Sequence, residues 1–201
     1  RADTPAELER IAEVVREPDV LVVCDEAYEH IVFDGRPHVP LATLPGMADR
    51  CLRIGSAGKT FSLTGWKVGY TSGPPDLVAA AARCHQSLTF ATPPALQRGV
   101  AYGLGKEDAY FDGLRDGLQS KRDRLATGLE ALGIEVLPWE GTYFLNARLA
   151  SAGLAGPDVE VCRTLVEQAG VAAIPLSAFY LDADAPRDTV RFCFSKRDEV
   201  L

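Results

Sequence analysis

The sequence contains few histidines and no long apolar run. Its 3 histidines (His30, His38 and His85) form no metal-ligand spacing, so we expect no bound metal. No apolar stretch approaches the roughly 20 residues that cross a bilayer, which argues against a membrane-spanning segment. Acidic residues outnumber basic ones by 28 to 21, and the net charge of −7 argues against nonspecific binding to nucleic acid or to an anionic membrane.

The cysteines lack the pattern of a disulfide framework. The 5 cysteines are widely spaced and lie mostly in apolar segments, at Cys24, Cys51, Cys84, Cys162 and Cys193. A small disulfide-stapled domain usually has an even number of them at regular spacing. We therefore expect reduced cysteines in the core of a cytoplasmic protein. A hydrophobic content of 47% over 201 residues suffices for one large or two small domains.

Residues 51–70 (CLRIGSAGKTFSLTGWKVGY) contain the most informative lysine of the chain. Lysine is normally protonated near neutral pH and becomes a nucleophile when its pKa is lowered or a carbonyl is positioned beside it. Lys59 follows a run of small residues (GSAG), which leaves room for a flat ligand. Ser56, Thr60 and Lys67 supply groups that suit a phosphate. The segment therefore indicates a ligand that combines an anion with a carbonyl.

Three interpretations of this segment compete. A nucleotide-binding P-loop also ends in Gly-Lys-Thr, but its first glycine would fall at Arg53. A serine acyl-enzyme would use Ser56-x-x-Lys59, but Phe61 stands where that class has glycine, and no Ser-Asp-Asn triplet occurs. The third interpretation is a lysine that binds pyridoxal phosphate, and it is the one that further motifs support.

The pattern Ser56-x-x-Lys59-x-Phe61-x-x-x-Gly65-x-Lys67 resembles the cofactor-attachment motif of class I/II aminotransferases, the aspartate-aminotransferase-like family of fold type I. Residues 20–28 (VLVVCDEAY) are similar to the family's strand that ends in Asp-Glu-x-Tyr. Residues 171–180 and 190–201 look like its C-terminal domain. The resemblance covers nearly the whole chain and is nearest the branch of kynurenine/glutamine and N-succinyldiaminopimelate aminotransferases.

The resemblance implies a role for each residue of a cofactor site. Lys59 would hold pyridoxal 5'-phosphate as an internal aldimine and would later move a proton between the substrate α-carbon and the cofactor. Asp25, at the end of a buried strand, would keep the ring nitrogen protonated. Tyr28 would donate a hydrogen bond to the phenolic oxygen of the cofactor. Ser56 and Lys67 would bind the phosphate, with lysine in place of the arginine of other branches.

Further residues are implied in substrate recognition. Arg191 alternates with apolar neighbours on an expected strand, where a charge that faces the core would need an anion. The resemblance names that anion as the substrate α-carboxylate. Phe90 and Thr92 would face the active site of a partner subunit. Tyr143 and Phe179 would either line the substrate pocket or pack in the core.

The expected reaction is transamination between an α-amino acid and a 2-oxo acid, in a homodimer with shared active sites. Two alternatives stay open. One is a pyridoxal-phosphate-dependent C–S β-lyase of the same fold, because substrate positioning decides which bond breaks. The other is an inactive truncated fragment, since the chain begins without methionine at a helix capping box, Thr4-Pro5-Ala6-Glu7. We expect roughly the first half of a complete enzyme to lie outside this sequence.

The expected fold is α/β, a mostly parallel sheet with helices followed by a smaller α+β domain. Residues 1–104 would form the C-terminal part of a cofactor-binding large domain, 105–132 a linking helix, and 133–201 a small C-terminal domain whose final helix is truncated. The expected helices span 5–17, 76–90, 94–104, 107–132 and 158–169. The expected strands span 20–24, 52–55, 68–72, 134–137, 143–147, 171–174 and 190–194.

Overall fold

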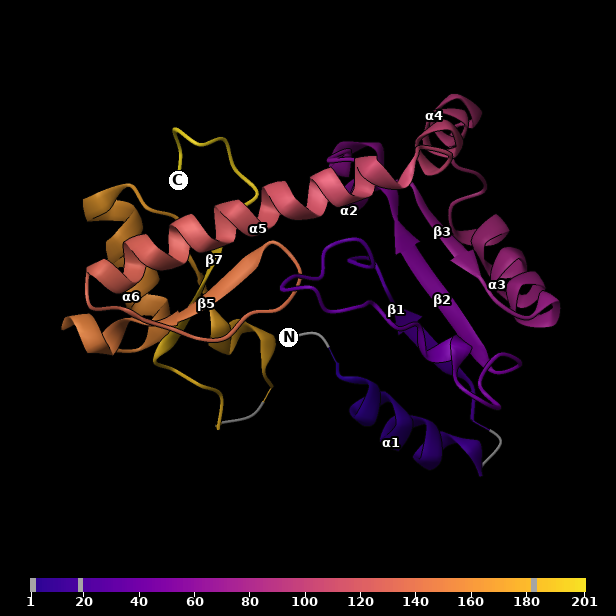
Figure 1. The fold of residues 1–201 in the computed structure, drawn as a ribbon, viewed down its shortest axis with the longest axis horizontal. Helices are drawn as coiled ribbons and strands as arrows, with labels where there is room; N and C mark the ends of the chain where they lie inside the picture. The colour runs from indigo at the N-terminus through magenta and orange to yellow at the C-terminus, as the bar shows by residue number, and fades with distance from the viewer. Residues whose placement is uncertain (1–2, 18–19, 182–183) are drawn as a thin grey trace. The chain divides into compact units, whose positions relative to one another are not determined.

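The chain folds into two compact units, each of which mixes strands and helices. A computed structural model describes residues 3–17, 20–181 and 184–201. One unit comprises residues 2–114 and the other residues 115–201. Helix α5 (Asp108–Ala131) begins in the N-terminal unit and ends in the C-terminal unit (Figure 1). The expected α/β class is confirmed, and none of the described helices is long and apolar enough to cross a bilayer.

The N-terminal unit contains a three-stranded sheet in the order β1-β2-β3 (Figure 1). Its strands are β1 (Val22–Asp25), β2 (Cys51–Ser56) and β3 (Gly69–Ser72). β1 and β2 are parallel, with Asp25 opposite Ile54, whereas β3 pairs antiparallel with β2. The carboxyl ends of β1 and β2 therefore emerge at the same edge of the sheet.

Helix α1 (Pro5–Arg16) covers one face of this sheet. Its start is the predicted capping box, because the Thr4 hydroxyl accepts a hydrogen bond from the Glu7 N–H and the Glu7 carboxylate accepts one from the Thr4 N–H. The buried Ala12 of α1 belongs to the same core as Met47 and Cys51. The helix that the sequence predicts is thus placed by burial of its apolar stripe.

The opposite face of the sheet is exposed. Side chains alternate along a strand, so Cys24 packs against the core beneath α1 while Val23 is 63% exposed. Asp25 is exposed on the same face as Val23, and so is Ile54, its partner on β2. The edge that carries the carboxyl ends of β1 and β2 therefore has one covered side and one accessible side.

Two helices follow β3, and they differ in burial. None of the 14 residues of α3 (Pro75–Leu88) is buried. Helix α4 (Pro94–Leu104) buries Val100 in a cluster with Ala57 and Val68. Both helices begin at a proline, which has no N–H and so removes one of the donors that the first turn of a helix leaves unpaired. Helix α4 therefore packs directly against the segment that follows β2.

The C-terminal unit contains a four-stranded antiparallel sheet in the order β4-β5-β7-β6. Its strands are β4 (Glu135–Val136), β5 (Phe144–Arg148), β6 (Ile174–Pro175) and β7 (Thr189–Cys193). The two central strands build the core, since Leu145 and Ala147 of β5 and Val190 and Phe192 of β7 are all buried. These alternating positions match the apolar pattern of the sequence.

One expected strand is wrong over most of its length. Helix α6 (Asp158–Thr164) continues as a π-helical turn, Leu165–Ala169, and ends at Gly170, which has a φ of 65°. The Val171 N–H then donates to the Leu165 carbonyl, so this backbone closes the helix instead of joining the sheet. Of the expected strand 171–174, only residue 174 pairs with β7, within β6.

The cysteines are free, but they are not all in the core. Cys51 and Cys162 are buried, and Cys24 and Cys193 are half-buried. The expectation of a core cysteine is wrong for Cys84, which is exposed. Its helix, α3, buries none of its residues against the described chain, so the apolar neighbours of Cys84 do not indicate burial.

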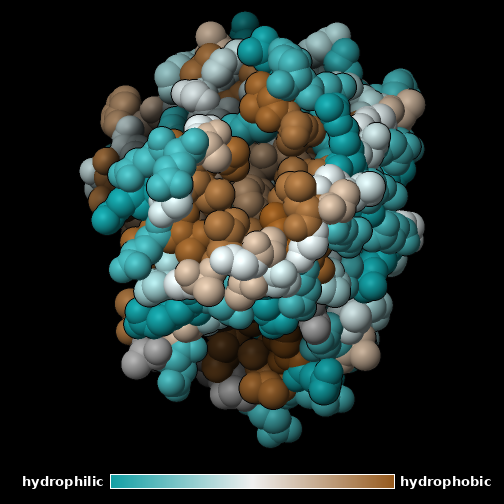
Figure 2. Space-filling model, turned by 90° about the vertical axis from the view of Figure 1, so that its left-hand side faces the viewer, coloured by the Kyte–Doolittle hydropathy of each residue, from teal (hydrophilic) through white to brown (hydrophobic). Residues whose placement is uncertain are grey.

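Apolar side chains also reach the surface. Figure 2 shows one face of the molecule, on which hydrophobic side chains gather in hollows between hydrophilic ones. In the C-terminal unit the exposed large apolar side chains include Val159, Val166, Phe179 and Tyr180. Exposure of this kind is typical of surfaces that bind a ligand or another polypeptide.

We predict that Asp158 is a stability determinant of the C-terminal unit. Its carboxylate is 1% exposed and accepts hydrogen bonds from the N–H and the hydroxyl of Ser177, both at 2.8 Å. Asp158→Ala should lower the free energy of unfolding by about 2–3 kcal/mol, because two partly buried donors of Ser177 lose their acceptor. Urea unfolding measures this change. Glu160→Ala, an exposed change on the same helix, should cost less than about 0.5 kcal/mol, and equal costs for the two variants would contradict this role.

Candidate active site

Asp25 and Ser56 mark the edge of the sheet where β1 and β2 end. The Asp25 Oδ1 accepts a hydrogen bond from the Ala27 N–H at 3.2 Å. Ser56 ends β2, two residues beyond Ile54, the partner of Asp25. The carboxyl edge of parallel strands is where α/β sheets usually bind ligands. A carboxylate and a hydroxyl are thus presented from neighbouring strands at that edge.

Lys59 lies in α2 (Ala57–Thr60), a single helical turn directly after β2. The residue before it is tightly enclosed, because a Cβ at Gly58 would lie 3.1 Å from the Cα of Thr64. The Lys59 amine lies 5.8 Å from the centre of the Tyr28 ring, and both side chains are half-buried. The structure therefore brings together the lysine and the tyrosine that the sequence predicts to act on one ligand.

A pocket of about 260 Å³ opens beside this turn. Its described lining residues are Ser56, Gly58, Lys59, Thr64, Lys67, Val68 and Gly69. These residues offer two amines and two hydroxyls, and none of them is acidic. Such a set of donors suits an anion, and a phosphate in particular, because charged and neutral donors can each meet one of its oxygens.

Lys67 is held in a strained backbone conformation beside this pocket. Its φ of 54° lies in the left-handed region, which costs a residue other than glycine about 1–2 kcal/mol. Glycine would relieve this strain but would remove the amine from the pocket. A strained residue at a lined pocket is a reason to look for a function.

Thr60 does not belong to the pocket, although the sequence predicts it as a phosphate ligand. Its side chain is buried, and its hydroxyl donates to the Ser56 carbonyl at 3.3 Å. The prediction for Thr60 is therefore wrong, because its hydroxyl stabilises the α2 turn. Thr64, which the sequence analysis missed, lines the pocket instead, and its hydroxyl donates to the Gly58 carbonyl at 3.3 Å.

Helix α4 supports the lysine turn from behind. A Cβ at Gly103 would lie 2.9 Å from the Phe61 ring, and a Cβ at Gly99 would lie 2.9 Å from the Trp66 ring. The two glycines are four residues apart, so they lie on one face of the helix. The two aromatic rings that follow the Lys59 turn, Phe61 and Trp66, can therefore approach the α4 backbone closely.

Arg191 lies in the C-terminal unit, between two aromatic rings. Its guanidinium carbon is 4.2 Å from the centre of the Phe179 ring and 5.2 Å from that of Phe144. Its Nε donates to the Asn146 Oδ1 at 3.4 Å. The neighbours of Arg191 on β7 fill the core, and the Arg191 side chain points to the other face of the strand. A charge buried in the core is therefore not the reason to expect an anion beside Arg191. Its role as a carboxylate ligand stays a prediction.

The other residues that the sequence predicts near the substrate or a partner subunit are exposed or half-buried. Phe179 is 56% exposed, and the interpretation of this ring as core packing is wrong. The Tyr143 ring is half-buried and lies 4.8 Å from that of Phe144. Phe90 is 80% exposed with a φ of 65°, and Thr92 is half-buried. Their expected contact with a partner subunit stays a prediction.

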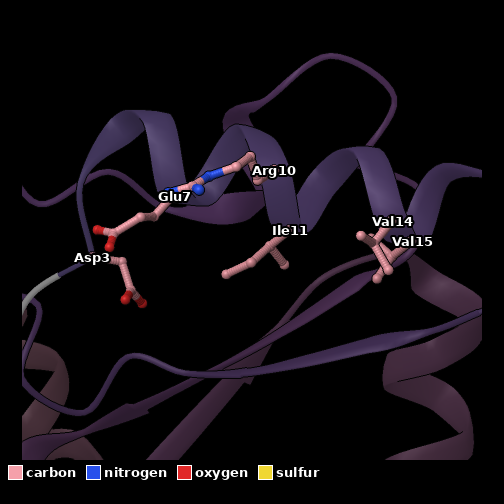
Figure 3. A pocket seen from close by; sticks show the side chains of 6 residues that line it. All are labelled: Asp3, Glu7, Arg10, Ile11, Val14 and Val15. Carbon is pink, nitrogen blue, oxygen red and sulfur yellow. The ribbon is translucent and has the colours of Figure 1, made fainter.

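A second hollow, of about 520 Å³, runs along α1 and lacks the predicted chemistry (Figure 3). Its described lining residues are Asp3, Glu7, Arg10, Ile11, Val14 and Val15. They combine apolar side chains with charges of both signs and include no lysine that could attach a carbonyl. The pocket beside Lys59 is therefore the candidate active site.

Within the described ranges, one group of side chains has the spacing of a metal site. Atoms of Glu26, Glu29 and His38 lie within 4.8 Å of one another. The Arg53 guanidinium contacts both carboxylates, at 2.6 and 2.9 Å, and supplies the positive charge between them. In the sequence, Arg53 is notable only as the residue that breaks a P-loop pattern, and no local motif indicates this network.

Comparison with known proteins connects these features to one family. The model of the family described as aminotransferase class I and II matches residues 2–201. The probable N-succinyldiaminopimelate aminotransferase DapC of Mycobacterium tuberculosis is 43% identical over 203 residues, which cover 97% of this chain and 51% of that protein. The kynurenine–oxoglutarate transaminase of Dictyostelium discoideum is 40% identical, with 97% of this chain and 50% of that protein covered.

A solved structure gives the same result. The chain matches N-succinyldiaminopimelate aminotransferase from Mycobacterium tuberculosis with a TM-score of 0.94 and 44% identity, over 98% of this chain and 51% of that one. The chain thus spans about half the length of the curated relatives it matches. The resemblance and the fold predicted from the sequence motifs are confirmed.

We predict that the thiols behind the site are unreactive. Cys24 and Cys51 hydrogen-bond each other across β1 and β2, and burial raises the pKa of Cys24 to about 11 and also raises that of Cys51. A raised pKa leaves the thiol protonated near neutral pH. Iodoacetamide should therefore label the exposed Cys84 at least about tenfold faster than Cys24 or Cys51.

Peptide mass mapping over time measures these labelling rates. Labelling of Cys24 should increase as the pH rises toward 11, because the thiolate fraction increases. In the control variant Cys84→Ser the fast reaction should disappear. Equal rates at Cys84 and Cys24 near neutral pH would contradict the prediction.

Proposed function

The chain belongs to the aminotransferase class I and II family, and we propose that it carries the catalytic lysine of a pyridoxal-phosphate-dependent transamination between an α-amino acid and a 2-oxo acid. The observation that carries the proposal is the position of Lys59. Its amine lies 5.8 Å from the Tyr28 ring, in a pocket lined by hydroxyls and a second amine. A lysine positioned in this way can attach to a carbonyl.

The residues of this site fit pyridoxal phosphate. When bound, the cofactor supplies an electron sink for the charge that develops at the substrate α-carbon. Lys59 would hold its carbonyl carbon covalently, and the Asp25 carboxylate would pair with the ring nitrogen. Tyr28 would donate a hydrogen bond to the ring oxygen. Ser56 and Lys67 would bind the phosphate. The described pocket lining contains no acidic residue, which favours binding of an anion there.

Lys59 would also act as the base of the reaction. Once the substrate amine had displaced it, the Lys59 amine would be neutral and close to the substrate α-carbon. It would then move a proton between the substrate α-carbon and the cofactor carbon to which it had been attached. Tight enclosure of Gly58 against Thr64 limits the movement of the turn that carries Lys59, which favours a fixed path for this proton.

Arg191 is proposed to bind the substrate α-carboxylate. The guanidinium carbon lies over the Phe179 ring, 4.2 Å from its centre, and over the Phe144 ring, 5.2 Å from its centre. A carboxylate binds a guanidinium through its edge, where two N–H groups can donate in parallel. Stacking and carboxylate binding are therefore compatible at one side chain, and the rings would hold its plane in a fixed orientation.

The substrates are proposed from the relatives and from the segment before α4. The relatives named above act on N-succinyldiaminopimelate or on kynurenine and oxoglutarate, as their names state. We propose an amino donor of this range with a 2-oxo acid as acceptor. Residues 85–97 contain no arginine, so this segment offers no second carboxylate clamp of the aspartate-aminotransferase kind.

A cytoplasmic homodimer is proposed as the working state of the enzyme. The exposed side chain of Phe90, held at a φ of 65°, supports a role in contact with a partner. Helix α3, which precedes it, buries none of its residues within the described chain. Free cysteines agree with a reducing compartment.

The first test of the proposal is covalent labelling of the chain. The purified protein is mixed with pyridoxal phosphate and reduced with borohydride, and the modified lysines are located by peptide mass mapping. We expect Lys59 to be modified selectively, at least about tenfold over the exposed Lys106. Lys59→Arg should abolish this labelling and leave the others unchanged. Scattered or absent labelling would contradict cofactor binding by this chain and would favour an inactive fragment.

The second test concerns the reaction. The product of the complete gene is assayed with glutamate, glutamine, methionine, kynurenine and N-succinyldiaminopimelate as amino donors and with 2-oxo acids as acceptors. We expect transfer of the amino group, and a decrease in kcat/KM of at least about a hundredfold in Arg191→Gln, because the carboxylate loses a bidentate partner. Cleavage of a thioether substrate with release of pyruvate and ammonia, and no transamination, would identify a C–S β-lyase instead.

A further inference from the structure

A polar network of the N-terminal unit lies behind the proposed cofactor site. The Arg53 Nε donates to the Glu26 Oε2 at 2.6 Å, and its Nη2 donates to the Glu29 Oε2 at 2.9 Å. The Tyr70 hydroxyl donates to the other oxygen of Glu29 at 2.5 Å. His38 contacts the Glu26 carboxylate at 3.2 Å. One guanidinium thus holds two carboxylates, one of which a phenol also holds.

The network joins two strands of the sheet to the turn that follows the third. Arg53 belongs to β2 and Tyr70 to β3, whereas Glu26 and Glu29 belong to the turn after β1. Arg53 shares its face of β2 with Cys51, in the core beneath α1, so the network lies on the side of the sheet opposite to Asp25. It can therefore hold the site together without occupying it.

Tyr28 lies between the two carboxylates in the sequence. The Glu26 N–H donates to the Ile54 carbonyl at 2.9 Å, and the Glu29 N–H donates to the Glu26 carbonyl at 3.0 Å. These two hydrogen bonds fix the backbone on each side of Tyr28. The side chains of Glu26 and Glu29 are in turn bound by Arg53, the residue before Ile54. This arrangement sets the position of the Tyr28 ring relative to the strand that leads to Lys59.

Partial burial strengthens the electrostatic contacts of this network. The Glu26 and Glu29 side chains are 8% and 15% exposed, and that of Arg53 is 30% exposed. Burial lowers the pKa of Arg53, but the two carboxylates outweigh this effect and raise it. Burial and the Glu29 carboxylate also raise the pKa of Tyr70, so its hydroxyl stays a donor. Removal of the guanidinium would leave two poorly solvated carboxylates close together.

Gly55 allows Tyr70 to complete the network. The two residues pair across β2 and β3, and a Cβ at Gly55 would lie 2.1 Å from Cε2 of the Tyr70 ring. The ring therefore lies directly over the Gly55 backbone, one residue before Ser56. A side chain at this position would displace the phenol from Glu29.

From this arrangement we propose that Arg53 is a positioning residue: through Glu26 and Glu29 it holds the turn that carries Tyr28 in register with the strand that delivers Lys59. Tyr70 supports the same turn from β3. The inference rests on the proposed function, because Tyr28 and Lys59 act together only if they bind one cofactor. The network itself is a property of the described residues and can be tested without cofactor.

The cofactor-free test is hydrogen exchange of the full chain followed by mass spectrometry. In Arg53→Met the backbone amides of residues 26–31 should exchange at least about tenfold faster than in the native chain. Arg16→Met is the matched control, because Arg16 pairs with Glu9 in the same unit but away from the turn. Unchanged exchange at residues 26–31 in Arg53→Met would overturn the proposal. Tyr70→Phe, which removes one hydroxyl, should give a smaller increase in the same segment.

The cofactor-dependent test is the absorption of pyridoxal phosphate bound to the chain, titrated with pH. Loss of the Tyr28 hydrogen bond should move the midpoint of the spectral change upward by about one pH unit. Tyr28→Phe and Arg53→Met should each produce this shift, and the double variant should shift no further, because Arg53 acts through Tyr28. Arg53→Lys should restore part of it, and Tyr102→Phe, at an exposed tyrosine, should leave the midpoint unchanged.

The outcomes separate the two proposals. Additive shifts in the double variant would mean that Arg53 acts independently of Tyr28 and would overturn the positioning role. If the native chain forms no adduct at Lys59, the proposed function fails for this chain, and the exchange experiment alone decides whether Arg53 positions the turn. Asp25, His30 and the network carboxylates also lie near Tyr28 and Lys59 and contribute to the titration. Each variant keeps these groups except at its changed position, so a difference between two midpoints reports the substitution.

Discussion

The parallel pairing of β1 with β2 is the constraint on which the candidate site depends. It brings the carboxyl ends of the two strands to one edge of the sheet, although the 30 residues between Asp25 and Ser56 separate them in the sequence. Asp25 emerges from one strand, and Ser56 and the α2 turn emerge from the other. One-sided coverage by α1 leaves this edge accessible from the opposite face. A slip of one residue in the register would turn Asp25 to the covered side.

Different kinds of force act on the two sides of this sheet. On the accessible side the side chains offer donors and charges to a ligand. On the covered side a paired guanidinium and an apolar cluster fix the backbone from which those side chains project. The C-terminal unit repeats this division on β7, where core residues alternate with Arg191 and aromatic rings orient its guanidinium. In both units the strand that carries a proposed functional side chain is fixed by core residues on its other face.

Elements with a strong local pattern could be predicted from the sequence. The apolar run before Asp25, the glycine and prolines before α3 and the amphipathic stretch of α5 correspond to elements within a few residues of the expected ranges. The motif around Lys59 also indicated the pocket residues Ser56 and Lys67. Local patterns suffice here because the capping, turn and periodicity signals lie within a single segment.

Features that depend on distant contacts could not be predicted. The Arg53–Glu26 pair joins residues 27 apart, and no spacing rule links a strand arginine to a turn carboxylate. The direction of Arg191 depends on which face of β7 the rest of the unit covers. Thr60 and Thr64 lie four residues apart in one motif, yet only the fold determines which hydroxyl lines the pocket. The Val171 N–H closes the π-helical turn after α6, a contact that the strand-like residues 171–174 do not indicate.

The glycines of α4 have a consequence for how the site is formed. Each glycine in a helix interior costs about 1 kcal/mol, and a helix of 11 residues is marginal by itself in water. Helix α4 therefore depends on the Phe61 and Trp66 rings that its glycines admit, and those rings belong to the turn around Lys59. Helix and turn should consequently gain and lose order together. The catalytic lysine of the proposed enzyme would then belong to one cooperative folding unit that includes α4 and, through the contacts of the Phe61 ring with Tyr110 and Phe111, the start of α5.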